Sequence, residues 1–460
     1  MLRDYQIKLI EDIRASMREG CKSILLQSPT GSGKTILTAF MLKTAAEKGM
    51  HSWFVVHRRE LIKQSTIEFS QIGVKNGIIS NGFMEDGRYP IQIGSVQTLI
   101  RRHKKLKPPK FIIWDECHHC AAKSWSELHN YFPNSFHVGL TATPERLDGK
   151  GLGKWFKKMV NGPSVSWLIE NGFLSPYKLY APPGIVTQGL HTRMGDYAKE
   201  ELVSVSDKPS ITGDAIKHYK KLCEGKRAVV FCVSIEHSKH VVEQFNAEGI
   251  TAAHVDGETE TDIRDEAVKK FREGKIKVLS NVELFGEGFD LCSLEAAILL
   301  RPTQSLGLYL QQIGRSLRPF EGKNNAIILD HAGNCQRHGL PDEEREWSLD
   351  GEEGRTSKSQ DKIKVKICPK CYGAQTQGSL ICIVCGYKFE IKERKIAHVD
   401  GELIEIDPEK LRWSRRKEQA KTQTYDDLVR LGRARGYKRA EMWAAHIMRA
   451  RQIKKLMGVA

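Results

Sequence analysis

The sequence predicts an α/β fold of two tandem units, each a parallel β-sheet flanked by helices, followed by a small cysteine-rich module and a helical tail. Short apolar runs alternate with amphipathic stretches over residues 1–160, and the alternation returns after residue 210. Such alternation is typical of parallel sheets, because each pair of parallel strands needs a crossover connection. Two Cys-x-x-Cys pairs lie near residue 370, and residues 408–460 are strongly basic.

The individual elements follow from the apolar runs and the amphipathic stretches. The first unit is predicted to contain the strands Ser23–Gln27, Ser52–His57, Ile91–Gly94, Phe111–Asp115 and Phe136–Thr141, and the helices Lys34–Glu47, Glu60–Ile72 and Val96–Arg102. The second unit is predicted to contain the strands Ala228–Val233, Ala252–Val255, Val278–Asn281, Ala296–Leu300 and Ala326–Asp330. Two similar units in tandem suggest a cleft between them.

Changes in composition set the expected boundaries. Between the two units the alternation is interrupted by Pro176, Pro182, Pro183 and Gly184. Residues 339–366 are polar and highly charged, as in a linker. The predicted parts are a first domain (1–165), a connector (166–210), a second domain (211–338), a charged linker (339–366), the cysteine module (367–390) and a basic helical tail (391–460).

Length and charge narrow the class of protein. At about 150 residues per domain, 460 residues predict about three units. No run of 18 apolar residues occurs, and the first motif begins at Leu2, so we expect an intracellular protein with no membrane partner. The net charge is +16, of which +10 lies in residues 408–460. This charge favours a polyanionic partner, although a basic surface without a ligand remains an alternative.

A phosphate-binding loop follows the first predicted strand and opens the first predicted helix of the alternation. Its sequence is Ser-Pro-Thr-Gly-Ser-Gly-Lys-Thr, with a serine where the general pattern has its first glycine. Backbone N–H groups of such a loop converge on phosphate oxygens, the lysine neutralises the β/γ charge, and the last hydroxyl can ligate Mg²⁺. The candidate ATP-binding residues are Pro29, Thr30, Gly31, Ser32, Gly33, Lys34 and Thr35.

Two carboxylates end the apolar run Phe111–Trp114. Asp115 is a candidate Mg²⁺ ligand beside Thr35, and Glu116 a candidate for polarising the attacking water. Adjacent carboxylates at a strand end can also form an ordinary solvated turn, but the phosphate loop upstream favours catalysis. The following run from Cys117 to Cys120 could suggest a metal site. Four consecutive residues cannot all converge on one tetrahedral ion, so we do not expect one.

Taken in order, the motifs resemble those of the DExH-type superfamily 2 helicases, and within them the RadD-like and phage-encoded branch. The resemblance covers residues 1–335 and implies two RecA-like domains. It rests on Arg3-Asp4-Tyr5-Gln6, the phosphate loop, His57-Arg58-Arg59-Glu60-Leu61, Gly94-Ser95-Val96-Gln97-Thr98, Asp115-Glu116-Cys117-His118, Thr141-Ala142-Thr143-Pro144, Gly286-Glu287-Gly288-Phe289-Asp290, Arg301-Pro302-Thr303, Gln311-Gln312-Ile313-Gly314-Arg315-Ser316-Leu317-Arg318 and Ile328-Leu329-Asp330.

The resemblance implies a role for each matched position. Arg3 and Gln6 would contact adenine, and Gly288 and Asp290 would lie at the domain interface and contact the nucleotide. Nucleotide state would be coupled to domain motion through His118, Thr141 and Thr143. The second domain would supply catalytic residues, namely Gln311, Arg315 and Arg318. A cation delivered across a cleft stabilises transition-state charge only when the cleft is closed, which ties hydrolysis to closure.

A motor of this type grips mainly the sugar-phosphate backbone, because backbone contacts carry no sequence information and permit stepping. In the second domain the candidates are Ser234 and the turn around Asn281. Those of the first domain are Arg58, Arg59, Ser95, Gln97 and Thr98. Arg58 and Arg59 fit equally well as surface charges that cap a helix.

The two cysteine pairs predict a structural zinc site formed by Cys368, Cys371, Cys382 and Cys385. Four thiolates at this spacing suit tetrahedral zinc, with iron as the main competitor, whereas a redox dithiol would need only one pair. In the tail, the segments 413–417 and 433–439 interleave aromatic residues with cations. They could clamp a duplex or a junction, or form a helical hairpin with a solvated basic face.

These features predict an ATP-, Mg²⁺- and Zn²⁺-dependent DNA helicase or translocase that acts on single-stranded, forked or branched DNA in repair, recombination or replication. Replication or recombination proteins are possible partners, and the cell is expected to be bacterial or phage-infected. RNA is the less favoured substrate, because Cys117-His118 and Gln311-Gln312 depart from the pattern of RNA-type DEAD-box members. A second alternative is an ATP-gated clamp or the translocating subunit of a multi-protein nuclease complex.

Overall fold

The computed structural model describes residues 2–57, 59–81, 83, 86–146, 149–181, 190–193, 196–207, 209–282, 294–350, 365–389, 417–419, 421–422, 424–435 and 440–456. It divides into two compact units, Met1–Ile391 and Lys392–Ala460. Arg58, Gly288 and Asp290 lie outside the described residues, as do most of the basic segments predicted in the tail. None of the helices in the described parts of the chain has the length and hydrophobicity needed to cross a bilayer.

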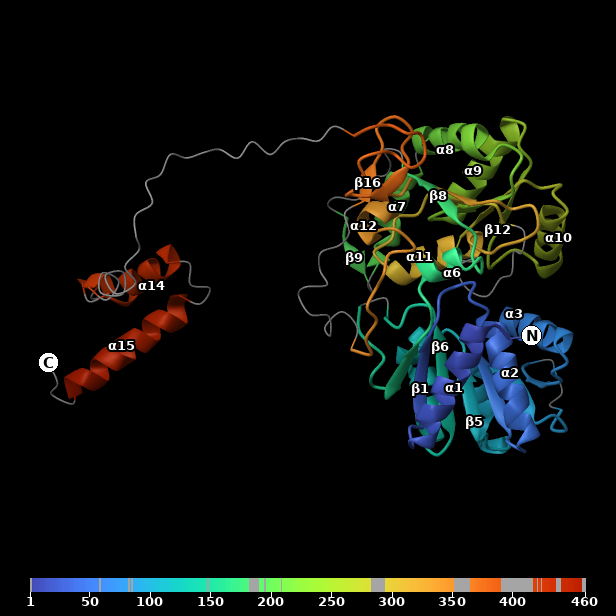
Figure 1. The fold of residues 1–460 in the computed structure, drawn as a ribbon, viewed down its shortest axis with the longest axis horizontal. Helices are drawn as coiled ribbons and strands as arrows, with labels where there is room; N and C mark the ends of the chain where they lie inside the picture. Colours follow the sequence, from blue (N-terminus) through green and yellow to red (C-terminus); the bar gives the residue numbers. More distant parts are fainter. Residues whose placement is uncertain are drawn as a thin grey trace. The chain divides into compact units, whose positions relative to one another are not determined.

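The first domain is a seven-stranded parallel sheet flanked by helices (Figure 1). Its strand order is β3-β4-β2-β5-β6-β1-β7. The strands are β1 (Ser23–Gln27), β2 (Ser52–Val56), β3 (Gly77–Ile79), β4 (Ile91–Ser95), β5 (Phe111–Trp114), β6 (Phe136–Thr141) and β7 (Lys158–Asn161). The helices are α1 (Asp4–Arg18), α2 (Lys34–Glu47), α3 (Arg59–Gln71), α4 (Val96–Arg102) and α5 (Lys123–Tyr131), with 3₁₀ turns at His103–Lys105 and Cys117–Ala121.

The second domain is a six-stranded parallel sheet in the order β12-β13-β11-β14-β15-β8. Its strands are β8 (Tyr177–Tyr180), β11 (Ala228–Phe231), β12 (Ala252–Val255), β13 (Val278–Asn281), β14 (Ala296–Leu299) and β15 (Ala326–Asp330). The described helices between and around them are α6 (Val165–Glu170), α7 (Lys199–Ser206), α8 (Pro209–Cys223), α9 (Ile235–Ala247), α10 (Thr261–Arg272), α11 (Leu306–Ser316) and α12 (Asn334–His338), and β9 (Thr192–Arg193) pairs with β10 (Asp196–Tyr197). The predicted α/β fold class is therefore confirmed.

Both faces of each sheet are buried, which explains why the strands read as continuous apolar runs. In β1, Ile24 and Leu26 enter one core cluster, whereas Leu25 enters another on the opposite face. The phosphate loop follows β1, the two carboxylates follow β5, and Thr141 ends β6. Because all these strands are parallel, their carboxyl ends meet at one edge of the sheet, where ligands of open α/β sheets bind.

Two segments differ in form from what the sequence suggested. Strand β8, in the range expected to be a connector, pairs with β15 and extends the second sheet. Residues 339–350, in the range expected to be a charged linker, pack against both domains. The Gly153 amide of the first domain donates to Leu349 O at 2.8 Å, and Tyr309 Oη of the second domain donates to Gly339 O at 3.0 Å. Within the segment, the Arg345 guanidinium donates to the carbonyls of Leu340 and Glu343. These backbone contacts hold a charged segment that lacks an apolar pattern.

The cysteine module and the tail are small elements with different attachments. β16 (Val365–Ile367) and β17 (Ala374–Thr376) form a hairpin that contacts strand β8, where the Ala181 amide donates to Tyr372 O at 2.9 Å. The described part of the second unit includes the helices α14 (Tyr425–Ala434) and α15 (Ala440–Leu456), which confirms the predicted helical tail. Their shared core includes Leu428 and Ala444.

Candidate active site and metal centre

The phosphate loop is held open by two glycines with left-handed backbone angles. Gly31 and Gly33 have φ of 86° and 83°, a conformation that side chains with a Cβ rarely adopt. Lys34 begins α2, and its Nζ donates to Ser28 O at 3.0 Å and to Pro29 O at 3.3 Å. Burial lowers the pKa of Lys34, while the nearby carboxylates of Glu116 and Asp115 act in the opposite direction. A buried ammonium beside this loop suits a phosphate ligand.

The two carboxylates stand beside that lysine at the end of β5. The Asp115 amide donates to Val55 O at 2.9 Å, which fixes the turn. Glu116 has φ 46° and ψ 53°, a left-handed conformation that is strained for a residue other than glycine. Its buried Oε2 receives no hydrogen bond among the described residues, and His118 Nδ1 lies 3.4 Å away. Strain of this kind concentrates at functional sites, since the surrounding structure must hold it.

A chain of polar contacts connects these carboxylates to the second domain. His118 Nδ1 lies 3.2 Å from Thr141 Oγ1, which donates to Thr143 O at 2.8 Å. On the other side, a Cβ built on Gly307 would lie 2.8 Å from Thr143 Oγ1, so helix α11 begins directly against Thr143. The structure thus brings together the three residues predicted to couple nucleotide state to domain motion.

Helix α11 and the turn that follows it place the predicted arginines beside the phosphate loop. A Cβ built on Gly314 would lie 2.7 Å from Thr30 Cβ, and one built on Gly31 would lie 3.5 Å from Arg318 Cγ. Arg315 is buried within α11, and both arginines are close enough to Lys34 to lower its pKa further. Gln311 is also buried in this helix. Residues from opposite halves of the sequence therefore meet at one loop.

Lys323 fixes the end of α11 and was not identified from the sequence. Its Nζ donates to Arg318 O and Leu294 O, each at 2.9 Å, and also to Ser316 O. Burial lowers the pKa of Lys323 to about 8. A cation at a helix C-terminus satisfies carbonyls that lack partners within the helix. The only hint in the sequence is a lysine shortly after the helix, which is too common to be diagnostic.

The N-terminal motif supports the loop from its other side. Gln6 Nε2 donates to Ser32 O at 3.2 Å, and Gln6 Oε1 accepts from the Arg3 amide at 3.0 Å. Tyr5 Oη donates to Ser32 O at 2.5 Å. The Arg3 guanidinium lies 4.4 Å from the ring centre of Phe173. Arg3 and Gln6 thus border the nucleotide site, and the contact of Arg3 with a residue beyond the first domain was not foreseen.

The described candidates for nucleic-acid contact lie at or shortly after the carboxyl ends of strands. Ser95 caps α4, and its hydroxyl donates to Thr98 Oγ1 at 3.0 Å, whereas Gln97 is exposed. Ser234 caps α9, and Asn281 Nδ2 donates to Val230 O at 2.8 Å. Arg59 begins α3, but its side chain lies outside the description. Their contact with nucleic acid stays a prediction.

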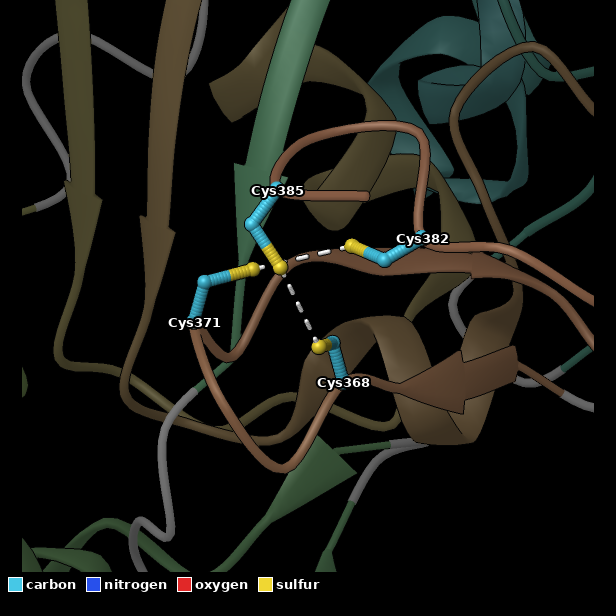
Figure 2. A group of neighbouring side chains, drawn as sticks. All are labelled: Cys368, Cys371, Cys382 and Cys385. Carbon is cyan, nitrogen blue, oxygen red and sulfur yellow. Dashed lines mark hydrogen bonds between the residues drawn. The ribbon is translucent and has the colours of Figure 1, made fainter. Parts of the chain in front are cut away.

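Four cysteine sulfurs converge in the module beside β8 (Figure 2). All lie within 4.8 Å of one another. Two pairs are closer, Cys368 to Cys385 at 3.7 Å and Cys371 to Cys382 at 3.6 Å. Zinc bound tetrahedrally at about 2.3 Å from each sulfur requires sulfur atoms about 3.8 Å apart, whereas a disulfide requires about 2.0 Å. The geometry therefore fits a four-thiolate metal site and not two disulfides.

The run after Glu116 does not form a second metal centre among the described residues. Cys117 and Cys120 are buried in apolar surroundings, and burial raises the pKa of both thiols. A thiolate ligand would be unfavourable there.

Comparison with known proteins places this geometry in a family. Residues 1–146 match the family described as "Type III restriction enzyme, res subunit", and residues 214–319 match "Helicase conserved C-terminal domain". A 51.5 kDa protein of a Lactococcus phage (isolate 7-9) is 36% identical over 390 residues, covering 84% of this chain and 83% of the phage protein. A Saccharomyces cerevisiae protein named as an ATP-dependent helicase, IRC3, is 30% identical over 364 residues, covering 72% of this chain but only 52% of that protein.

A more distant relative agrees with this assignment, and a solved structure shares the fold. The "DNA 3'-5' translocase XPB2" of Sulfurisphaera tokodaii is 26% identical over 375 residues, covering 72% of this chain and 81% of that protein. A fragment from Vibrio vulnificus YJ016, described as an HsdR subunit of a type I restriction enzyme, shares the fold. Its TM-score is 0.59 at 23% identity, covering 74% of this chain and 66% of that one. The chain belongs to the DExH-type superfamily 2 helicases, which are nucleic-acid-dependent ATPases.

Proposed function

We propose that this protein is an ATP-dependent DNA helicase or translocase that acts on single-stranded, forked or branched DNA in repair, recombination or replication, inside a bacterial or phage-infected cell. The observation that carries the proposal is the contact of α11 with the phosphate loop, where Gly314 meets Thr30 and Arg318 meets Gly31. We call this contact between the two domains the domain seam. Arginines at the domain seam stabilise transition-state charge only while the two domains are in contact. Closure and reopening would then step the two domains along one strand.

The residues of the site divide this work between the two domains. Lys34 and the loop amides bind and orient the phosphates of ATP. Thr35 and Asp115 would hold Mg²⁺, which would neutralise phosphate charge. Glu116 polarises the attacking water, and its fixed left-handed backbone keeps the carboxylate in place. Arg315 and Arg318 supply charge from the second domain, and Gln311 lies on α11 with Arg315.

DNA is the favoured substrate on three grounds. The net charge of +16 suits a polyanion, and +10 of it lies in residues 408–460. One relative is named as a DNA translocase. The Cys117-His118 and Gln311-Gln312 pairs differ from the pattern of RNA-type members. Ser95, Gln97, Thr98, Arg58 and Arg59 would contact the strand backbone from the first domain.

The decisive experiment compares ATP hydrolysis across nucleic acids. The rate is measured with single-stranded, duplex, forked and four-way DNA and with matching RNA, beside Glu116→Gln as the inactive control. We expect stimulation by DNA and directional movement on labelled single strands in stopped-flow measurements. Hydrolysis that responds to RNA alone would identify an RNA helicase, and hydrolysis indifferent to all of these would refute the motor.

A second candidate is the translocating subunit of a multi-protein nuclease complex. The first domain matches a family named for a restriction enzyme subunit, and the solved neighbour is described as a subunit of another such enzyme. Cleavage would then require a partner. A nuclease that co-purifies stoichiometrically with this chain would favour this candidate, and unwinding by the purified chain alone would favour the first.

A further inference from the structure

Three aromatic side chains gather beside the phosphate loop and come from both sides of the domain seam. Tyr5 lies on α1, Trp167 on α6, and Phe173 in the turn that follows. The ring centres of Tyr5 and Phe173 are 5.2 Å apart, those of Tyr5 and Trp167 are 5.7 Å apart, and those of Trp167 and Phe173 are 5.8 Å apart. These are ordinary distances for interacting rings.

This aromatic cluster (Tyr5, Trp167 and Phe173) borders the nucleotide site directly. Tyr5 Oη donates to Ser32 O in the phosphate loop. Leu174, which follows Phe173, packs so closely that a Cβ on Gly31 would lie 2.8 Å from its Cδ2. Trp167 is 37% exposed, so the cluster offers an open face. A nucleotide whose phosphates occupy the loop would bring its base close to these rings.

The chemistry of the cluster suits a flat heteroaromatic ring. The Arg3 guanidinium, itself planar, already stacks over Phe173 at 4.4 Å. Both polar atoms of the Gln6 amide are engaged by backbone groups, Oε1 by the Arg3 amide and Nε2 by Ser32 O. Stacking on the rings is a contact available to the base in addition to the polar groups of Arg3 and Gln6. Stacking of a base on an aromatic side chain contributes about 1–3 kcal/mol and tolerates different bases.

We propose that Trp167 and Phe173 form the base-binding wall of the ATP site, so that the segment joining the two domains holds the base. This proposal rests on the ATPase function. Ser164 caps α6 by accepting from the Trp167 amide at 3.2 Å, which fixes one ring. The Ser175 amide donates to Leu317 O at 2.7 Å, which ties the other ring to the end of the arginine helix. A bound base is thus linked to the placement of Arg318.

The test separates base binding from phosphate binding in the full-length chain. Trp167→Ala and Phe173→Ala are compared with the conservative variants Trp167→Phe and Phe173→Tyr, and with Tyr131→Ala, an exposed aromatic residue on α5. We expect the KM for ATP to rise on the order of tenfold in each alanine variant, much more than kcat falls. The conservative variants and Tyr131→Ala should stay close to the unmodified chain.

Inorganic tripolyphosphate serves as the probe that lacks a base. Its inhibition constant should be the same in the unmodified chain and the alanine variants, because the phosphate loop alone binds it. A KM for ATP unchanged in both alanine variants would overturn the proposal, as would a parallel weakening of tripolyphosphate, which would indicate a damaged loop. Because Trp167 is partly exposed, its variant should fold even if Phe173→Ala does not. Absence of ATP hydrolysis in the unmodified chain would instead contradict the proposed function.

Discussion

The nucleotide site and the cysteine cluster both begin as short sequence motifs, but they are assembled in different ways. The four cysteines lie between residues 368 and 385, and a single hairpin with its following turn brings their sulfurs together. The nucleotide site gathers residues from Arg3 to Lys323, and its two halves meet only because α11 packs against the loop after β1. The assembly of the local cysteine site therefore depends on its ligand. The assembly of the non-local nucleotide site depends on how the two domains are positioned. The effects of mutations should differ accordingly.

The largest effect on kcat is expected from removing a cation that the second domain places beside the phosphate loop of the first. Arg318→Ala leaves the phosphate loop intact but removes a cation from the transition state, so kcat should fall on the order of 10³-fold. Binding of a non-hydrolysed ATP analogue should weaken far less. The matched control is Lys270→Ala, which removes an exposed cation from α10 in the same domain. Equal loss of hydrolysis in both variants would show that overall charge, and not the seam, is responsible.

Disrupting the local site should unfold a small region without abolishing the nucleotide site. Cys382→Ser or removal of zinc should release the module, because such a small element depends on its metal for folding. The hydrogen bond from the Ala181 amide to Tyr372 O should then be lost, and hydrogen exchange at β8 should accelerate. Bound zinc is measured in parallel, with Cys21→Ser, outside the cluster, as the control. Retention of zinc and of protection at β8 would contradict the four-thiolate site.

The close contact between the two domains can be tested by adding one methyl group between them. Gly314→Ala places a Cβ 2.7 Å from Thr30 Cβ, closer than real contacts allow, so the loop and α11 must separate. Misplacement of about 1 Å can cost on the order of 10²-fold in rate, and we expect a loss of that order in kcat. Gly213→Ala, at an exposed position of helix α8 with no neighbour within 4 Å, is the matched control. Undiminished hydrolysis in Gly314→Ala would mean that catalysis does not use this contact.

The difference between local and non-local features also explains what could be predicted from the sequence. All ten predicted strands occur, with ends that differ by at most two residues, because strands buried on both faces read as apolar runs. Strands β3 and β7 and edge strand β8 were not predicted, since β3 has only three residues and β7 is partly exposed. The four cysteines were identified completely, as their spacing alone carries the geometry.

The carboxylates of the candidate nucleotide site were predicted from the apolar strand that precedes them and from the phosphate loop upstream, whereas the arginines were predicted from resemblance and order along the chain. Tertiary packing alone reveals the contacts that position them. Gly314 against Thr30, Phe173 against Arg3, and Lys323 against the end of α11 each join segments distant in sequence or lack a motif. Distances across the seam therefore could not be derived before the structure.

Lys323 should have the smallest effect, and its signature is a dependence on pH. Lys323→Met removes the hydrogen bonds to Ser316 O and Arg318 O, so kcat should fall by about tenfold or less through looser placement of Arg318. Burial lowers the pKa of Lys323 from 10.5 to about 8 in the folded chain. In the unmodified protein, kcat should decline as pH rises through about 8 and the ammonium is lost. The methionine variant should lack this component of the pH profile.

The free energy of unfolding should rise over the pH range in which kcat falls. Between about pH 8 and 10.5 the unfolded chain keeps the Lys323 proton that the folded chain has released. The free energy of unfolding of the unmodified protein should therefore rise with pH relative to Lys323→Met, by at most about 1.4 kcal/mol per pH unit. Denaturant unfolding of both proteins at several pH values measures this difference. Parallel pH dependences of stability and of kcat in the two proteins would show that Lys323 is an ordinary surface lysine and that other contacts position Arg318.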